Sequence, residues 1–341
     1  FVETVAEKDV TVDKALENID IGGPTMIRSA AKNFKDVAVV VNPDDYNEII
    51  DELNKNQGQI SDEMKLKLAY KAFRHTYNYD RHIQDYFAEV LADKKENLEE
   101  DENSIFSKEL VMDYKKKADL RYGENPHQQA AFYEERTLNE PSITSAEQLY
   151  GKELSFNNIN DTNGALELIK EFEEKPAAAV IKHANPCGTA VAADLKTAYV
   201  KAHAGDPLSA YGSIVALNRK VTAEVATEIT GEDKFVEVII APSYEEKALE
   251  LLKERWNNIR IMKTGELHIN KDEPGFAMKK VTGGLLVQER DLAGIKAESE
   301  LEIVTEKNPT ESQMKDLLFS WKVVKYVKSN AIVMAKDEMI V

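Results

Sequence analysis

The sequence predicts an α/β protein built from two regions. Short apolar runs that end in turn residues recur along the chain, as expected of buried strands, and segments with apolar residues three and four positions apart separate them, as expected of helices. A charge-dense stretch at 93–103 has the composition of an exposed connection between domains. We therefore expect a first domain over 1–92, a charged linker over 93–117 and a second domain over 118–341.

The first region is predicted to be mostly helical. Residues 11–19 suggest a short helix, and 22–33 suggest a second one with a proline in its first turn, where proline is well tolerated. The apolar run at 37–41 is predicted to be a buried strand. Helical periodicity follows at 44–53 and at 62–92, where it allows one or two amphipathic helices.

The second region is predicted to alternate strands with helices. Strands are expected at 177–181, 213–217, 236–241, 284–287 and 331–335. Two of the intervening helices begin with the capping-box pattern, a Ser or Thr followed three residues later by Glu or Gln. Ser243 with Glu246 begins a helix that runs to Trp256. Thr310 with Gln313 begins another.

The composition excludes several classes of protein. The chain has 341 residues, 43% of them hydrophobic, and a formal net charge of −17, which argues against a nucleic-acid surface because such a surface needs clustered basic residues. No apolar run approaches the roughly 20 residues that span a bilayer. The first ten residues do not resemble a signal peptide. We therefore expect a cytosolic protein that binds neither nucleic acid nor membrane.

The most informative stretch is 176–188, Pro-Ala-Ala-Ala-Val-Ile-Lys-His-Ala-Asn-Pro-Cys-Gly. Its apolar half is predicted to be a buried strand, which would place Lys182 and His183 just beyond the carboxyl end, where open α/β sheets bind ligands. The alternative, a polar turn that merely caps a core strand, stays open at this point. Cys187 could be a thiol nucleophile with His183 as its base, but a lone cysteine between proline and glycine is more often a packed small residue.

Standard signatures of cofactor and metal sites are absent from the sequence. There is no Walker loop, and neither Gly22-Gly23 nor Gly283-Gly284 satisfies the dinucleotide fingerprint. A zinc deaminase needs a second cysteine, whereas this chain has one. We therefore expect no catalytic metal.

Two polar clusters precede the Lys-His pair along the chain. The first, at 120–128, contains Arg121 and Tyr122, and the second, at 155–163, contains Asn160. An arginine can pair bidentately with phosphate, and asparagines supply donors and acceptors to a base or an amide.

Taken together, these clusters resemble the bifunctional purine biosynthesis family, which combines formyltransferase activity on 5-aminoimidazole-4-carboxamide ribonucleotide (AICAR) with inosine monophosphate (IMP) cyclohydrolase activity. Five motifs stand in the order seen in that family: Arg121-Tyr-Gly-Glu-Asn-Pro-His127, Ser155-Phe-Asn-Asn-Ile-Asn160, Ile181-Lys-His-Ala-Asn-Pro-Cys-Gly188, Ser209-Ala-Tyr-Gly212 and Val324-Lys-Tyr-Val-Lys-Ser-Asn330. Residues 19–33 resemble the later half of the cyclohydrolase domain.

The resemblance implies a fold and a set of ligands. The fold would be the C-terminal part of a methylglyoxal-synthase-like domain followed by cytidine-deaminase-like α/β transformylase units. The ligands would be 10-formyltetrahydrofolate as cosubstrate, AICAR, its formylated product FAICAR, and IMP, bound by a homodimer. Because the family continues on both sides, and because the chain begins and ends within structured patterns, we expect a part of a longer protein.

The resemblance also implies roles for particular residues. His183 would transfer a proton at the amine of AICAR, Lys182 would assist electrostatically, and Asn330 would position the formyl group. Of the cyclohydrolase positions, Asp20 and Lys32 are present. The positions that match those holding the nucleotide are Arg121, Tyr122, Asn160, Gly212 and Glu237.

Two alternatives remain at this point. One is a non-catalytic nucleotide-binding or assembly fragment of such an enzyme. The other is a nucleoside deaminase, which the missing second cysteine disfavours.

Overall fold

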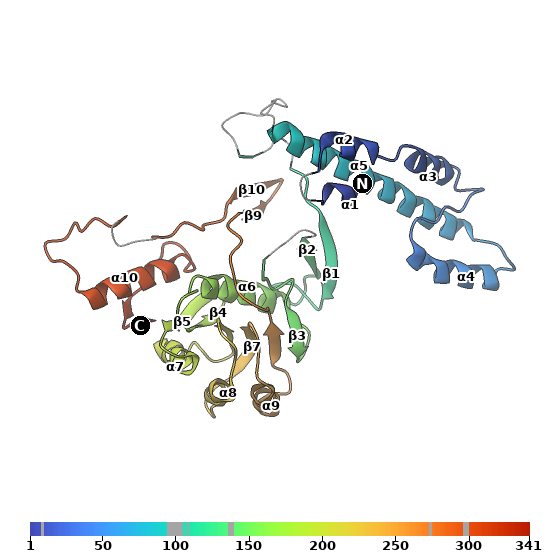
Figure 1. The fold of residues 1–341 in the computed structure, drawn as a ribbon. Coiled ribbons are helices and arrows are strands. Elements are labelled where there is room, and N and C mark those ends of the chain that lie inside the picture. Colours follow the sequence, from blue (N-terminus) through green and yellow to red (C-terminus); the bar gives the residue numbers. More distant parts are fainter. Residues whose placement is uncertain are drawn as a thin grey trace. The chain divides into compact units, whose positions relative to one another are not determined.

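The computed structural model of this protein describes residues 1–7, 10–93, 105, 106, 108, 110–135, 140–272, 275–295 and 300–341. They form two compact units, Phe1–Val111 and Met112–Val341 (Figure 1). The charged stretch at 93–103 lies, apart from Asp93, outside the described residues, and the predicted linker at 93–117 is described only in part. Among the described helices, none is both long and apolar enough to cross a bilayer.

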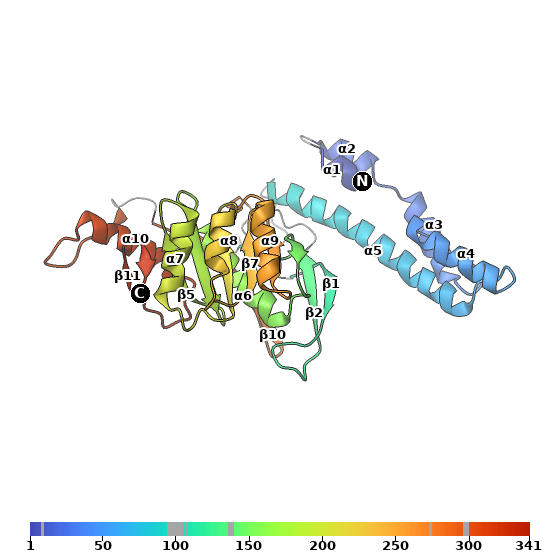
Figure 2. The same ribbon diagram turned by 90° about the horizontal axis from the view of Figure 1, so that it is seen from below.

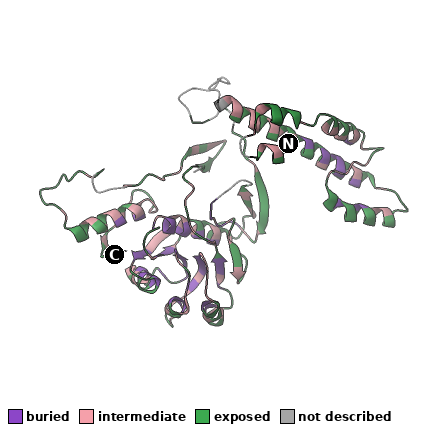
Figure 3. Cartoon of the chain, viewed as in Figure 1, coloured by how far each residue is buried: buried purple, intermediate pink, exposed green. Residues whose placement is uncertain are grey.

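The regular elements described in the first unit are all helices. They are α1 (Val2–Val5), α2 (Val12–Glu17), α3 (Gly22–Lys32), the 3-10 helix η1 (Pro43–Asp45), α4 (Tyr46–Lys55) and α5 (Asp62–Asp93). The helices predicted at 11–19, 22–33 and 44–53 are confirmed, and 62–92 forms one helix. Helix α5 contributes buried residues to two small clusters, one shared with α3 and one shared with α4 (Figure 3).

The strand predicted at 37–41 is wrong. The backbone there runs without regular structure between α3 and η1, and no described residue pairs with it in a β-ladder. Alternate side chains pack on different helices, because Val39 and Val41 join the α3–α5 cluster while Ala38 and Val40 join the α4–α5 cluster. The apolar run therefore reflects packing on both sides, and a strand would also need a neighbour to bond its backbone groups.

The second unit is built on an eight-stranded mixed sheet, ordered β11-β12-β5-β4-β6-β7-β8-β3. The strands are β3 (Glu147–Tyr150), β4 (Ala177–Lys182), β5 (Asn185–Val191), β6 (Ser213–Leu217), β7 (Val236–Ala241), β8 (Arg260–Lys263), β11 (Ala335–Lys336) and β12 (Met339–Ile340). Strands β6, β7 and β8 are parallel, whereas β4 is antiparallel to both β5 and β6. The prediction of an α/β protein is confirmed at this level.

Helices cover both faces of this sheet (Figures 1 and 2). They are α6 (Phe156–Lys170), α7 (Leu195–Gly205), α8 (Ala223–Ile229), α9 (Glu246–Arg255) and α10 (Glu311–Val324). Side chains of β4 alternate between the two cores: Ala178 and Val180 pack with α7, α8 and α9, whereas Ala179 and Ile181 pack with α6 and α10. Burial on both faces explains why β4 is an uninterrupted apolar run.

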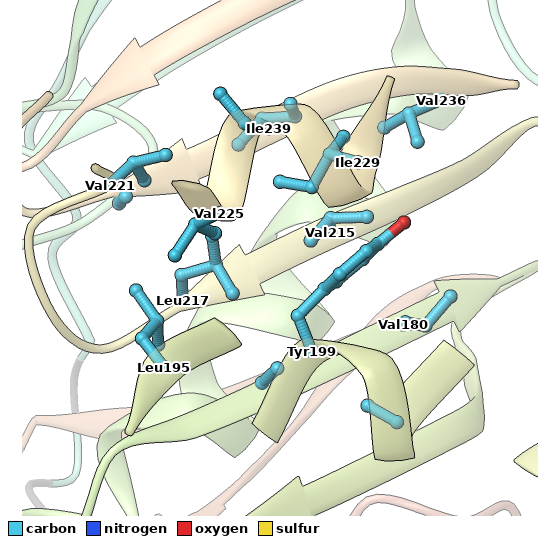
Figure 4. Packing of buried hydrophobic residues seen from close by; sticks show 14 of the residues in the cluster. Val180, Leu195, Tyr199, Val215, Leu217, Val221, Val225, Ile229, Val236 and Ile239 are labelled. Carbon is cyan, nitrogen blue, oxygen red and sulfur yellow. The ribbon is translucent and has the colours of Figure 1, made fainter. Parts of the chain in front are cut away.

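The core under α7 and α8 is centred on Tyr199, whose ring is fully buried (Figure 4). Val215 of β6 and Ile229 of α8 lie beside it in the same cluster. Burial of an aliphatic side chain of this size contributes about 1.5–3 kcal/mol. Packing in this core therefore holds β4 and β6 in place, together with the residues at the ends of these strands.

Two hairpins stand outside the large sheet. One pairs β1 (Tyr114–Leu120) with β2 (Ala130–Glu135), and the other pairs β9 (Phe276–Val281) with β10 (Gly284–Glu289). The strand predicted at 284–287 is thus confirmed, although it belongs to a hairpin and not to the sheet.

The strands predicted at 177–181, 213–217 and 236–241 are confirmed as members of the sheet, whereas the strand predicted at 331–335 is wrong except at its last residue. Residues 331–334 form no ladder, and Ile332 and Met334 are 89% and 68% exposed. Apolar composition in this segment therefore does not mark burial.

Of the two predicted capping boxes, the one at Thr310 and Gln313 is present at the start of α10. The one at Ser243 is wrong, because α9 begins at Glu246 and its N-cap makes no side-chain bond. The Ser243 carbonyl instead accepts the Val221 N–H at 2.9 Å, and this bridge keeps the chain extended before α9 begins.

Candidate active site

The Lys-His pair lies at the hairpin that joins β4 to β5. Lys182 is the last residue of β4 and faces Asn185 across the ladder, and His183 and Ala184 form the turn between them. Both turn residues have positive φ angles, 56° and 57°, as a tight two-residue hairpin turn requires. Such angles are uncommon outside glycine, so the turn holds the exposed His183 in a strained, protruding position.

Strand direction determines what surrounds this turn. Because β4 is antiparallel to β6, the carboxyl end of β4 lies beside the amino ends of β6 and β7. The Lys182 Nζ donates to the Gly212 carbonyl at 2.5 Å, and Glu237 is the second residue of β7. Side chains and backbone from three strands therefore meet at one edge of the sheet.

Both the backbone conformation at position 212 and the closeness of Lys182 require a glycine there. Its φ is +72°, and a Cβ at this position would lie 2.9 Å from the Lys182 Nζ. Its N–H donates to the Phe235 carbonyl at 2.7 Å, which fixes the peptide beside the lysine. The ammonium group can approach the backbone only because no side chain stands between them.

The residue that reaches Glu237 is Asn158, which the sequence did not single out. Its Nδ2 donates to the Glu237 carboxylate at 3.0 Å, and its side chain is buried. The same side chain completes a capping box with Ser155, so it ties the first turn of α6 to β7. Asn160 lies two residues along the helix, is exposed, and has its Nδ2 3.5 Å from Asp161. The available signal was a Ser-x-x-Asn pattern in the same motif.

A second residue that the sequence did not single out is Arg260 of β8. Burial lowers the pKa of its guanidinium, the Glu237 carboxylate opposes that shift, and the positive charge of Arg121 adds to it. Its buried Nε has no partner among the described groups. Arg121 itself is exposed, with its guanidinium carbon 5.1 Å from the centre of the Tyr122 ring. Arg121 and Tyr122, together with the distant Glu237, thus share one electrostatic neighbourhood around Arg260.

An acidic group also faces the turn. Burial raises the pKa of the Asp161 carboxyl, against the opposing effects of Asn160, His183, the Ala184 N–H and Lys182. The carboxylate therefore lies among the groups that hold the turn, on the side of α6.

The sulfur of Cys187 behaves as a packed group. Burial raises the pKa of its thiol to about 11, and the thiol donates to the Val180 carbonyl at 3.3 Å. A thiol with this pKa is protonated at neutral pH, which disfavours the nucleophile hypothesis. Within the described part of the chain, no group of three or more His, Cys, Asp or Glu side chains could hold a metal ion.

Asn330 lies in the segment that follows α10. It is exposed, and its Oδ1 accepts a hydrogen bond from the Ser329 hydroxyl at 3.1 Å. Two residues earlier, the Lys328 N–H donates to the Asn185 side chain at 3.3 Å. The segment is thereby attached to the hairpin that carries Lys182 and His183.

A cavity of about 940 Å³ lies in the second unit, between the two hairpins and α6, and Asn160 is among its lining residues. Its wall carries a buried charge network in which Glu140 accepts from Lys170 at 2.5 Å and from Arg290 at 2.8 Å. Burial would raise the pKa of Glu140, but the hydrogen bonds from Arg290 and Lys170 outweigh it and hold that pKa at about 2. The network joins Arg290, the residue after β10, to the C-terminal end of α6.

Asp20 and Lys32 belong to the first unit, at opposite ends of α3. Asp20 accepts the Gly23 N–H at 3.0 Å, and a Cβ on Gly23 would lie 2.3 Å from that carboxylate. Asp20 stands two positions before α3 and Lys32 is its last residue, so the rise of the helix, roughly 15 Å, lies between them.

One comparison with known proteins bears on this site. A family model described as AICARFT/IMPCHase bienzyme matches residues 30–341. The matched range includes Lys32, the whole second unit and the edge around Lys182, and it leaves Asp20 outside.

Proposed function

The chain belongs to the AICARFT/IMPCHase bienzyme family, a family of bifunctional purine biosynthesis enzymes, and we propose that it transfers the formyl group of 10-formyltetrahydrofolate to the 5-amino group of AICAR, giving FAICAR. We propose further that FAICAR is closed to IMP in the intact parent protein. The observation that carries the first proposal is the β4 edge, where His183 protrudes beside a lysine held by the Gly212 carbonyl.

The chemistry explains why such an edge is needed. The amine of AICAR is a weak nucleophile, because its lone pair is delocalised toward the neighbouring carboxamide. As its nitrogen bonds to the formyl carbon, the amine must lose a proton and the N10 nitrogen of the folate must leave with one. A neutral histidine suits the first transfer. The Lys182 ammonium supplies positive charge for the oxygen of the tetrahedral intermediate.

The nucleotide would be held by residues around Glu237. We propose that Arg121, Tyr122, Asn160, Gly212 and Glu237 bind AICAR, with Asn330 on the formyl side. The neighbourhood of Arg121, Arg260 and Glu237 supports this proposal, because guanidinium groups pair well with phosphate. The exposed position of Asn160 gives it less support than Asn158 receives from its bond to Glu237.

Finer features of the assignment are also proposals. The succession α6-β4-β5-α7-β6-α8-β7-α9-β8 supports a cytidine-deaminase-like unit within a transformylase domain over 118–341. A methylglyoxal-synthase-like origin of 1–92, a homodimer and a cytosolic location complete the proposal. Asp20 and Lys32 are the proposed ring-closing residues, and no catalytic metal is proposed.

The test replaces His183 in a way that keeps the turn. Asparagine tolerates a positive φ better than alanine, so His183→Asn removes the imidazole with the least strain. We expect kcat for formyl transfer to fall by about 10²- to 10⁴-fold, the usual contribution of a proton-transfer group, with the Kd for AICAR almost unchanged. His268→Ala, an exposed histidine in the loop after β8, is the matched control.

Wild-type turnover in folded His183→Asn protein would overturn the assignment. The alternative function, a non-catalytic nucleotide-binding fragment, predicts AICAR binding by calorimetry without formyl transfer. Measuring both quantities on one preparation separates the two.

A further inference from the structure

The segment at 325–334 is held firmly at both ends. At its start, the Lys325 ammonium and the Tyr326 hydroxyl each donate to the Glu171 carboxylate at 2.8 Å. Beyond its end, β12 pairs with β5, and the Glu338 N–H donates to Asp316 at 2.7 Å. The residues between these anchors connect α10 to the edge of the sheet.

The middle of the segment depends on one contact. Among the hydrogen bonds described for 328–333, the bond from the Lys328 N–H to the Asn185 Oδ1 is the one that joins this backbone to the sheet. Lys328, Ser329 and Asn330 are all exposed, so packing adds little there. Asn330 lies two residues from this attachment.

Asn185 also occupies a particular place in the hairpin. It is the first residue of β5, directly follows the His183–Ala184 turn and pairs with Lys182. One side chain therefore connects the segment that carries Asn330 to the turn that carries Lys182 and His183.

We propose that Asn185 is a positioning residue for formyl transfer. It holds the Asn330 segment at a fixed place relative to the Lys182–His183 turn. The groups that act on the formyl donor and those that act on the amine therefore keep fixed positions relative to each other. This inference rests on the proposed function. Reaction rates depend strongly on the placement of the reacting groups, since a displacement of about 1 Å can lower the rate about 100-fold.

The expected effect is a loss of kcat without a matching loss of nucleotide binding. Removing the tether with Asn185→Ala should lower kcat by about 10- to 100-fold, because the Asn330 segment is no longer fixed. KM for AICAR should change by less than about threefold, because Arg121 and Glu237 lie on other elements. Asn185→Asp keeps the acceptor oxygen and should restore most of the rate.

The donor side supplies a second pair of variants. Lys328→Pro removes the N–H that donates to the Asn185 side chain, whereas Lys328→Ala keeps that N–H and removes only an exposed side chain. We expect the proline variant to match Asn185→Ala and the alanine variant to match wild type. The double variant Asn185→Ala with Lys328→Pro should be no slower than either single variant, because both remove the same bond. Asn258→Ala, in an exposed turn, is the remote control.

Hydrogen exchange gives a readout independent of turnover. A peptide covering 328–333 should exchange faster in Asn185→Ala and in Lys328→Pro than in wild type, and at the wild-type rate in Asn258→Ala. Unchanged exchange, an unchanged kcat or additive losses in the double variant would overturn the positioning role. A wild-type protein that transfers no formyl group would instead refute the proposed function, and the exchange result would still decide whether Asn185 holds the segment.

Discussion

Replacing Gly212 by alanine tests whether the close approach of backbone and ammonium sets the geometry of the β4 edge. At a φ of +72°, a residue with a Cβ is strained by about 1–2 kcal/mol. The new methyl group would also lie 2.9 Å from the Lys182 Nζ, so the lysine would have to move. It would then lose its bond to the Gly212 carbonyl, a charged hydrogen bond of a kind that contributes about 1.5–3 kcal/mol.

Gly265→Ala separates the two effects. Gly265 has nearly the same φ, +76°, but beyond its chain neighbours no heavy atom lies within 4 Å of the place that a Cβ would take. Both variants should therefore lose about 1–2 kcal/mol through backbone strain, which lowers the Tm of a unit of this size by roughly 2–8 °C. Only Gly212→Ala should also displace Lys182 and lower kcat, by at least about 10-fold.

The assay is formyl transfer at saturating AICAR and folate, together with calorimetric Tm values for both variants. Saturation removes any effect of weaker nucleotide binding from the comparison. A kcat for Gly212→Ala equal to that of Gly265→Ala would refute the idea that the close approach sets the position of Lys182.

Nucleotide binding, the buried charge network and ring closure each give a further prediction. Arg121→Ala and Arg260→Met should each weaken AICAR binding in calorimetric titration by roughly 10- to 150-fold, the cost of one charged hydrogen bond, and unchanged affinity in folded protein would remove that residue from the pocket. Glu140→Gln should destabilise the protein by about 3–5 kcal/mol at neutral pH, because Lys170 and Arg290 lose a buried partner. Since the pKa of Glu140 falls from 4.5 to about 2 on folding, its contribution to the free energy of unfolding is complete above pH 4.5 and is lost as the pH falls toward 2. The difference in unfolding free energy between wild type and Glu140→Gln, measured with denaturant, should therefore narrow from pH 4.5 to pH 2. A difference that stays constant over this range would contradict the prediction. The isolated chain should not close FAICAR to IMP at a measurable rate, because Asp20, before α3, and Lys32, at its end, do not by themselves form the preorganised set of groups that catalysis needs; an increase in IMP absorbance would refute this.

The sequence alone determined the features that depend on neighbours along the chain. The buried strands at 177–181, 213–217 and 236–241 followed from apolar runs that end in turn residues, because a strand covered on both faces needs no polar alternation. The capping box at Thr310 followed from a local spacing of three residues. The family resemblance followed from ordered motifs, since each motif is itself a local pattern.

Tertiary structure decided which of these elements meet. The sequence could not distinguish a strand at 37–41 from an apolar segment between helices, because pairing requires a distant partner. Nor could it show that Asn158, and not Asn160, bonds to Glu237, because that contact joins a helix to a strand 79 positions away. The same holds for Arg260 beside Arg121. The antiparallel direction of β4 brings Lys182 to Gly212 at the amino ends of β6 and β7, and strand direction is set by long-range packing that no local pattern encodes.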